Sequence, residues 1–362
     1  GAVGVYNAEL EADTRQIVAS LDRLALHAHG SFGVKLDAVD EAVAAKLRDL
    51  ASRRLGWVIV DIDLVLPQQA LLEELRRFGV RVLAEVRTAE PLPASAAAQV
   101  DGVLVKGNEA GGFVGEDASF ILLQKWLQRG GLPLYLRGGL TPHVAAACAA
   151  VGVAGGVLES QLLLLDEVRL PEALRTLIGN LAGSETVAVG DGERGEYFRL
   201  LVRPALAAAR QFARDGDDLD EDALRPLVRG RAHWQEPAKG LLPIGQEVAF
   251  AAPWRKRYGH LGAVLAAIGE AVRTQPRLAA QQLPIADGAP LARSLGMRFP
   301  IVQGPMTRVS DMAEFACAVA REGALPFLAL SLMDEAQSRR LLEATRDAVV
   351  AASRLAIDWV RL

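Results

Sequence analysis

A chain of 362 residues can form one large α/β barrel with additions or two domains of ordinary size. Hydrophobic residues make up 51% of it, so a large buried core is possible. The formal net charge is −4, and the interspersed basic and acidic side chains give no positive stripe for a nucleic-acid backbone. Nucleic acid is therefore not an expected partner.

The sequence also gives no sign of a membrane or an oxidising compartment. The longest apolar stretch, 144–158, contains glycines and is shorter than the roughly 18 to 20 residues that span a bilayer. The two cysteines, Cys148 and Cys317, lie in Ala-rich helical patterns and indicate neither a disulfide framework nor a metal site. No charged-then-apolar signal segment opens the chain, and we expect a cytoplasmic protein.

Seven β-branched runs alternate with helical patterns in the first half of the chain. The predicted strands are 2–6, 32–36, 57–63, 80–86, 102–106, 132–137 and 155–159. Segments between them, such as 43–55 and 68–78, have apolar residues at helical spacing and stop at a glycine. This alternation predicts parallel strands, and units of about 25 residues with polar strand ends favour a barrel over a doubly wound sheet. The site is then expected at the carboxyl ends of the strands.

An eighth strand is missing from this series, and its candidate lies at 299–306, before a helical segment at 310–321. Residues 320–328 have the character of a helix end, a glycine turn and a strand, and residues 1–6 begin at the equivalent point. We therefore predict that 297–362 is the start of a second, related barrel repeat. The alternative is that this segment supplies the first strand of the barrel in a permuted arrangement.

The remaining segments complete the predicted domain organisation: barrel core at 1–180, C-terminal lobe at 181–280 and linker at 281–296. The acidic run at 215–222 is interpreted as a solvated loop or a helix start. Gly190 to Gly195 have the spacing of a dinucleotide fingerprint, but a β-like segment follows them, and Asp191 and Glu193 would repel a pyrophosphate. We predict a hairpin turn there.

The most specific motif is KGNEAGGFVG at 106–115. It resembles the Gly-x-Glu-(Ala/Ser)-Gly-Gly-His-x-Gly segment of nitronate monooxygenases (2-nitropropane dioxygenases) and flavin-dependent enoyl-acyl carrier protein reductases. Residues 300–306 are similar to the first strand and flavin-contacting loop of that family, 137–140 to its seventh strand and 154–160 to its eighth. Gly245-Gln246 resembles the Gly-Gln of its C-terminal lobe. The resemblance implies a (β/α)8 TIM barrel with a C-terminal extension.

The same resemblance implies FMN as the cofactor. The residues that it assigns to cofactor binding are Lys35, Lys106, Gly107, Gly111, Gly112, Gly138, Gly139, Gly156, Ser160, Pro305 and Met306. Glycines suit this role because backbone must approach a flat ring or a phosphate closely. A helix predicted to begin near Thr141 places its N-terminus where a phosphate would lie, although a Gly-Gly pair alone also makes a tight turn.

Three departures from the family pattern bear on activity. Phe113 stands where the catalytic histidine would be, and a phenyl ring cannot take or give a proton, so the catalytic residue stays unassigned. Lys35 replaces a flavin-contacting asparagine and is expected to pair either with a phosphate or flavin oxygen, or with Asp37 or Glu85. Glu159 replaces a small glycine, and its carboxylate would repel a phosphate.

Other polar residues are weaker candidates. Three acidic residues lie near strand ends and are expected to be either catalytic acids or members of structural ion pairs: Asp61, Asp63 and Glu85. Glu109 is expected to orient its loop by accepting hydrogen bonds from backbone amides. The histidine pair at positions 27 and 29 lies at the opposite end of the barrel without other ligands, so no metal is expected. His143 reads as a surface residue at a helix start, with a phosphate contact as the alternative.

Two functional hypotheses follow. The first is an FMN-dependent ene-reductase-like domain that acts on carrier-bound enoyl thioesters with NAD(P)H as hydride donor, because hydride transfer depends less on the lost base. The resemblance then implies a polyketide or fatty acid synthase context, with an acyl carrier protein and neighbouring synthase domains as partners and a possible homodimer. The second is a catalytically degenerate barrel that serves as a scaffold or docking module. Nitronate oxidation is a weaker third reading because of Phe113.

Overall fold

The computed structural model describes residues 2–353. The chain divides into two compact units, Gly1–Thr274 (unit 1) and Gln275–Leu362 (unit 2). One helix, α12 (Leu261–Gln282), runs across the boundary. The described part of the chain contains no helix long and apolar enough to cross a membrane.

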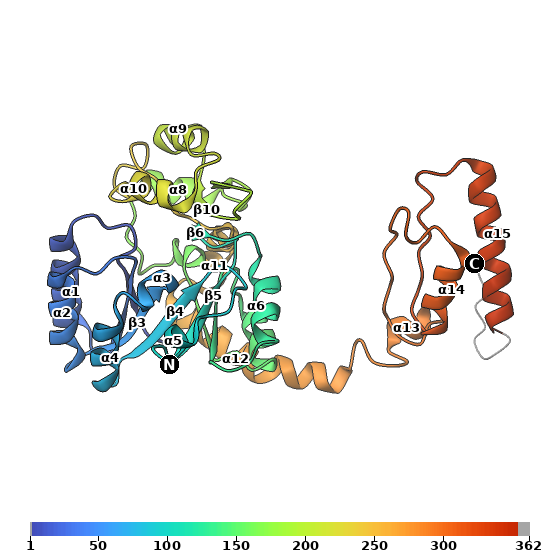
Figure 1. The fold of residues 1–362 in the computed structure, drawn as a ribbon, viewed down its shortest axis with the longest axis horizontal. Coiled ribbons are helices and arrows are strands. Elements are labelled where there is room, and N and C mark those ends of the chain that lie inside the picture. The colour runs from blue at the N-terminus through green and yellow to red at the C-terminus, as the bar shows by residue number, and fades with distance from the viewer. Residues whose placement is uncertain (1, 354–362) are drawn as a thin grey trace. The chain divides into compact units, whose positions relative to one another are not determined.

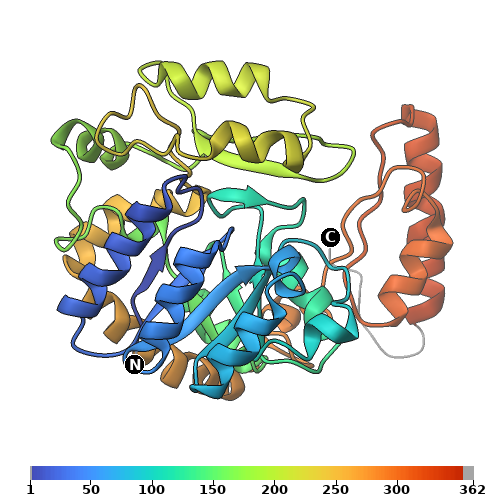
Figure 2. The same ribbon diagram turned by 60° about the vertical axis from the view of Figure 1, so that its left-hand side comes forward.

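Unit 1 is built on a curled parallel sheet of seven strands in the order β1-β2-β3-β4-β5-β7-β8 (Figures 1 and 2). The strands are β1 (Val5–Asn7), β2 (Phe32–Leu36), β3 (Leu55–Asp61), β4 (Arg81–Val86), β5 (Gly102–Lys106), β7 (Leu134–Arg137) and β8 (Gly155–Val157). All seven predicted strands are therefore confirmed in position. They are short, mostly buried and parallel, as expected for a sheet covered by helices.

Helices alternate with these strands and cover the outer face of the sheet (Figure 2). They are α1 (Thr14–His27), α2 (Glu41–Ala51), α3 (Ile62–Val65), α4 (Gln69–Arg77), α5 (Ala94–Ala97), α6 (Ser119–Leu127) and α7 (Pro142–Ala150). Their starts follow from the sequence: the side chain of Asp40 accepts a hydrogen bond from the Val43 amide at the start of α2. Thr141 does the same for the Val144 amide at the start of α7, with Pro142 as the first helical residue.

A C-terminal lobe covers the carboxyl ends of the strands (Figure 1). It contains α8 (Glu172–Gly179), α9 (Ala207–Asp215), α10 (Glu221–Val228), α11 (Ala251–Tyr258) and the 3₁₀ helices η1 (Ser160–Leu162) and η2 (Gln246–Phe250). Its antiparallel sheet joins β6 (Gly112–Val114), β10 (Tyr197–Leu201) and β9 (Thr186–Val189) in the order β6-β10-β9. Because β6 belongs to the glycine motif, this sheet fastens the lobe to the barrel loops.

Two local predictions for this lobe are confirmed. β9 and β10 pair antiparallel, so the segment between them, Gly190 to Gly195, is a hairpin connection. Asp220 caps α10 by accepting a hydrogen bond from the Ala223 amide, and the acidic residues that follow occupy the first turn. The acidic run therefore marks a helix start. The sequence did not predict β6.

Unit 2 contains α13 (Pro290–Ser294), α14 (Ala313–Arg321) and α15 (Glu335–Ser353). The predicted linker at 281–296 includes α13. The predicted strand at 299–306 is reduced to a parallel bridge between Val302 and Leu325. This bridge joins the two segments that flank α14, which is the beginning of a β-α-β unit.

Candidate functional site

Six charged side chains meet where the parallel strands of unit 1 end. They lie at or just beyond the carboxyl ends of six different strands and are called here the mouth network: Glu9, Lys35, Glu85, Lys106, Arg137 and Glu159. Parallel strands bring their carboxyl ends to the same side of a barrel, where the sites of such folds lie. The network therefore occupies the position where the sequence motifs predict a cofactor.

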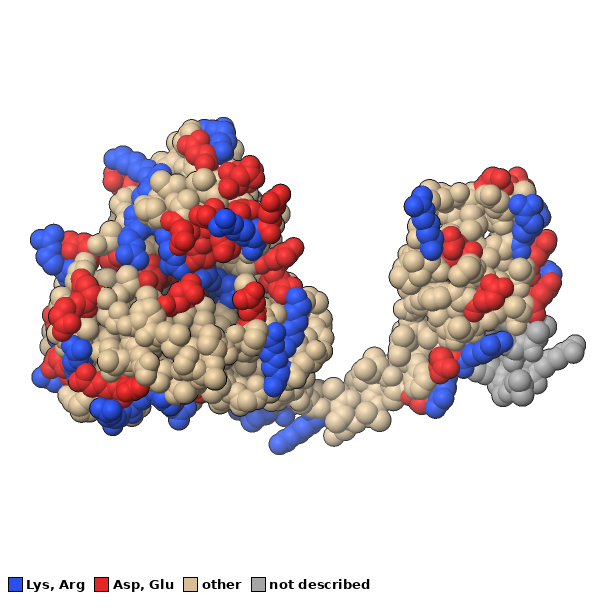
Figure 3. Space-filling model, viewed as in Figure 1, with Lys and Arg blue, Asp and Glu red and all other residues tan. Residues whose placement is uncertain are grey.

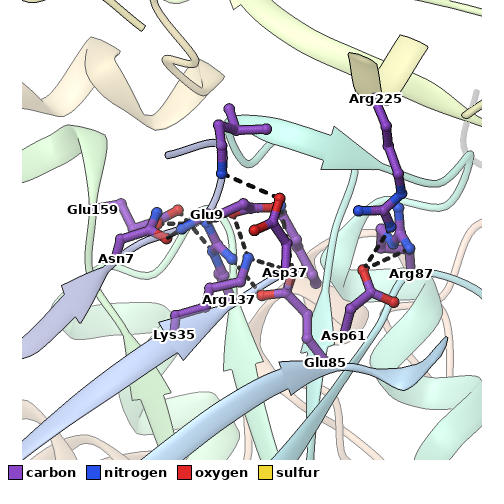
Figure 4. Close-up of polar contacts among 12 residues, drawn as sticks. Asn7, Glu9, Lys35, Asp37, Asp61, Glu85, Arg87, Arg137, Glu159 and Arg225 are labelled. Atoms are coloured by element: carbon purple, nitrogen blue, oxygen red, sulfur yellow. Dashed lines mark hydrogen bonds and ion pairs between the residues drawn. The ribbon is translucent and has the colours of Figure 1, made fainter. Parts of the chain in front are cut away.

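Lys35, at the end of β2, lies between two carboxylates (Figure 4). Its Nζ is 2.5 Å from Oε2 of Glu9 and 2.8 Å from Oε1 of Glu85. Each of the three side chains is at most 6% exposed. Of the two alternatives that the sequence left for Lys35, the structure shows the salt bridge with Glu85, together with a partner that was not predicted.

Arg137, at the end of β7, holds the other side of the network (Figure 4). Its Nε and Nη2 donate to the two carboxylate oxygens of Glu159 at 2.8 and 2.6 Å, a bidentate geometry. Its Nη1 donates to Glu85, and its Nη2 is 3.8 Å from Glu9. Glu159 is thus satisfied within the protein.

Lys106 is fully buried at the end of β5. Its Nζ lies 3.5 Å from Oε1 of Glu85 and has no hydrogen-bond partner among the described residues. Burial and, after it, the nearby Arg137 lower the pKa of Lys106 to about 8, against the opposite effects of Glu85 and Glu9. The amine thus belongs to the charged cluster, but no described residue accepts a hydrogen bond from it.

The carboxylates of Glu85 and Glu9 stay ionised although they are buried. Burial alone raises the pKa of Glu85, but Arg137, Lys106 and Lys35 outweigh it and hold the pKa well below its usual value. For Glu9, burial is again outweighed, here by Lys106 and Lys35, and the pKa falls to about 2. The cations of the network therefore hold Glu85 and Glu9 in their charged form.

Phe113, which occupies the histidine position of the motif, belongs to the core of the lobe. Its ring is 1% exposed and contacts Phe198 edge to face, with ring centres 5.1 Å apart. The guanidinium of Arg225 lies 4.9 Å from the centre of the ring. The phenyl ring therefore fills the histidine position by packing against Phe198. Its other neighbour is the cation of Arg225 and not a group that could react.

A second set of ion pairs ties α10 to the barrel and is called here the lobe clamp: Asp61, Arg87, Glu221 and Arg225. Asp61, at the end of β3, is 2.9 Å from Arg87 and 3.3 Å from Arg225 (Figure 4). Glu221 pairs with both arginines. Asp61 is therefore a structural ion-pair residue that holds the lobe over the strand ends. Asp63, two residues on, is outside the clamp, and burial raises its pKa.

The glycines of the motifs approach the chain itself closely. A Cβ on Gly111 would lie 2.1 Å from the carbonyl oxygen of Pro243. Gly138 and Gly139 have φ values of 108° and 61°, and a Cβ on either would lie 3.1 to 3.2 Å from the side chain of Glu109. A Cβ on Gly156 would lie 2.5 Å from Leu140. Packing of loop against loop thus accounts for these glycines.

The remaining motif residues pin the lobe to the mouth loops. The Gly245 amide donates to Oγ of Ser160 at 3.0 Å, and the Gln246 amide donates to the carbonyl of Glu109 at 2.7 Å. The carboxylate of Glu109 accepts from the Ser119 amide at 3.0 Å, which confirms the predicted role of Glu109 in ordering its loop. Ser160 is therefore occupied by backbone of the lobe.

Glu247, beside these loops in η2, was not predicted as a site residue. It is 3% exposed, and its Oε2 has no hydrogen-bond partner among the described residues. Burial raises its pKa to about 8, and the neighbouring Glu159 raises it as well. A third carboxyl group therefore lies near Glu109 and Glu159 on the side where the motifs predict a phosphate.

Two of the residues predicted to bind the cofactor, Lys35 and Lys106, lie together with two other residues that the sequence singled out. Lys35, Glu85, Lys106 and Glu159 meet in the mouth network. Pro305 and Met306 belong to unit 2. Glu9 and Arg137 were missed as site residues, although Arg137 ends a predicted strand and Glu9 lies three residues beyond another, which is the signal that would have found them.

The surface carries no large area of one charge on the face shown in Figure 3, where basic and acidic side chains are interspersed over both units. One hollow of about 450 Å³ lies in unit 1, beside Gly79, Val80 and Arg81. These residues precede or begin β4, so this hollow is at the end of the barrel opposite the mouth network. Another hollow, of about 410 Å³, lies in unit 2.

No protein-family model matches the sequence. Two curated relatives carry the same name, (3aS,4S,5R,7aS)-5-hydroxy-7a-methyl-1-oxo-octahydro-1H-indene-4-carboxyl-CoA dehydrogenase. The protein of Rhodococcus jostii is 31% identical over 110 residues, which is 30% of this chain and 31% of the relative. That of Mycobacterium tuberculosis is 28% identical over 207 residues, 55% of this chain and 58% of the relative. The chain thus spans about a third of one relative and less than three fifths of the other.

Solved structures match a larger share of the chain. FabK from Thermotoga maritima superposes with a TM-score of 0.58 at 18% identity, over 77% of this chain and 88% of its own. Nitroalkane oxidase from Streptomyces ansochromogenes gives 0.59 at 20% identity, over 77% and 90%. The enoyl reductase domain of MlnA from Bacillus amyloliquefaciens gives 0.52 at 10% identity, over 78% and 95%. The chain therefore has the TIM-barrel-type α/β fold of the enoyl reductase and nitroalkane oxidase family that its motifs resemble.

Proposed function

We propose that unit 1 is a catalytically degenerate barrel of this family that works as a docking or scaffold module. The observation that carries the proposal is the mouth network, whose buried ion pairs fill the position that the motifs assign to FMN. Removing one partner of a buried ion pair leaves an uncompensated charge at a cost of about 3 to 5 kcal/mol. A flavin ring would have to displace several such pairs at once.

The residues at the mouth do not fit FMN on its phosphate side either. Glu159 is bound to Arg137, and Glu109 packs against Gly138 and Gly139. A phosphate dianion near these groups would be repelled, and the one arginine of the network is already engaged by Glu85 and Glu159. No reaction step is therefore assigned to this barrel.

The lost base supports the same conclusion. Phe113 cannot transfer a proton, and its ring is enclosed by Phe198 and Arg225. Neighbouring synthase domains, which the sequence resemblance implies, are the partners that we propose for such a module.

The test is a flavin titration of the purified full chain. We expect a colourless protein and unchanged fluorescence of free FMN as folded chain is added, with folding checked by circular dichroism. A retained flavin absorbance band, or saturable quenching of FMN fluorescence, would overturn the proposal.

A second candidate is flavin-dependent oxidoreduction of acyl thioesters. It is favoured by the matches to two proteins whose name describes dehydrogenation of a carboxyl-CoA compound. Under this candidate the chain binds flavin and, with NAD(P)H, consumes a short 2-enoyl-CoA thioester. The same titration, followed by this assay, separates the two candidates.

A further inference from the structure

A charged hollow lies at the end of unit 1 opposite the lobe, where α4 ends and β4 begins (Figure 1). β4 is the middle strand of the sheet order, so the hollow is distant from both ends of that order. Five of its seven lining residues are charged: Glu73, Arg76, Arg77, Arg81 and Asp101. Because pockets for small molecules are lined mainly by apolar side chains, this lining suits a charged protein segment better.

The charges around the hollow are only partly paired. Arg76 donates to Oδ1 of Asp101 from Nε and Nη2 at 3.2 and 3.0 Å. Arg77 is 78% exposed, and its Nη2 is 3.9 Å from Oε2 of Glu73, which is too long for a hydrogen bond. Arg81 forms no ion pair with a carboxylate of residues 2–353. Two guanidinium groups therefore retain donors for an outside acceptor.

The two arginines are presented from ordered structure. The guanidinium of Arg81 lies 5.1 Å from the centre of the Trp57 ring, and that ring contacts Tyr135 edge to face. The turn that follows Arg77 is closed by Gly79, whose φ is 83° and whose amide donates to a carbonyl of α4 at 2.9 Å. Groups that are already held in place lose less conformational entropy when a partner binds.

An exposed aromatic side chain accompanies these arginines. Phe78 lies in the same turn, next to Arg77 in the sequence, and is 54% exposed. Aromatic residues and arginine are enriched in protein–protein interfaces and among the residues that contribute most to binding. The turn therefore combines an apolar contact with two cations that have no close anionic partner.

We propose that the turn between α4 and β4 docks an acidic segment of a partner protein, whose carboxylates pair with Arg77 and Arg81 and whose apolar side chain covers Phe78. The planar fork of donors on a guanidinium matches a carboxylate in a bidentate geometry. This deepens the proposed docking function, on which it rests, by naming the surface and the chemistry of the partner. Flavin binding would overturn that function, whereas the experiment below tests the surface by itself.

The experiment uses the full chain and a fluorescein-labelled synthetic peptide in which glutamates alternate with leucines. The same peptide with glutamine in place of glutamate is the charge control. Binding is measured by fluorescence anisotropy to the wild type and to the single variants Arg77→Gln, Arg81→Gln and Phe78→Ser. Arg210→Gln, which removes an exposed arginine from α9 in the lobe, is the matched control. Urea midpoints check that every variant is folded.

We expect saturable binding of the acidic peptide to the wild type and to Arg210→Gln, and about tenfold weaker binding to each of the other three variants. The binding should weaken as the salt concentration rises. Absence of binding, equal binding of the glutamine peptide, or unchanged binding to Arg77→Gln and Arg81→Gln overturns the proposal. Unchanged binding to Phe78→Ser also overturns it, and displacement of the peptide by inorganic phosphate at constant ionic strength would then indicate a site for a small free anion.

Discussion

At the scale of single residues, the phenylalanine at the histidine position of the glycine motif has a packing role instead of a chemical one. Phe113 occupies the place of a proton-transferring histidine, yet its ring is part of an aromatic cluster with Phe198 and lies against Arg225. Restoring the histidine therefore restores no chemistry, because the imidazole would face a hydrophobic core and two arginines, Arg87 and Arg225.

The corresponding prediction concerns Phe113→His. We expect no nitronate oxidation and a loss of about 2 to 4 kcal/mol in the free energy of unfolding, because a large buried ring is replaced by a polar one next to cations. Urea unfolding followed by tryptophan fluorescence measures this, since four of the five tryptophans lie in unit 1. Phe113→Leu, which stays apolar, should lose less. Nitronate oxidation by the histidine variant in the presence of FMN would contradict this account.

At the scale of elements, the mouth network joins strands that are distant in sequence. Glu85 on β4 contacts Lys35 on β2, Lys106 on β5 and Arg137 on β7. Neutralising Glu85 therefore leaves buried cations without a compensating charge. Such removal of one partner is strongly destabilising for a buried ion pair.

We predict that Glu85→Gln lowers the free energy of unfolding by about 3 to 5 kcal/mol. The matched control is Glu236→Gln, which removes the same charge from an exposed pair with Lys239 and is expected to leave the urea midpoint unchanged. If both variants unfold at the wild-type midpoint, the network is not formed in solution.

The sequence predicted the elements better than their contacts. Strand-helix alternation was sufficient to place all seven parallel strands, because both faces of such strands are buried and read as apolar runs. It could not predict β6, whose three residues pair with β10, a strand about 85 positions later in the chain. It also missed Glu9. The carboxylate that pairs with Lys35 is determined by the three-dimensional position of the loop after β1, which the sequence pattern does not give.

At the scale of the whole molecule, the buried carboxyl groups determine how stability varies with pH. The pKa of Glu247 is raised to about 8, so the folded chain holds a proton there that an unfolded chain loses above about pH 4.5. Its contribution to the free energy of unfolding therefore falls as pH rises from about 4.5 to 8 and is constant above that range.

Glu247→Gln is predicted to remove this fall, because glutamine resembles the protonated acid and does not titrate. Wild type and variant should unfold at similar urea concentrations near pH 5, and the variant should be more stable near pH 8 by as much as about 4 kcal/mol. Unfolding curves at matched ionic strength across this range give the difference. Parallel pH profiles would show that Glu247 is ionised in the folded chain.

The most direct test of the account is a crystal structure of the full chain grown with excess FMN. We predict that Arg137 remains bound to Glu85 and Glu159, that Lys35 remains between Glu9 and Glu85, and that no flavin density lies over the strand ends. A flavin ring seated at the mouth, with these ion pairs separated, would contradict it and would return unit 1 to the flavin-dependent reductases.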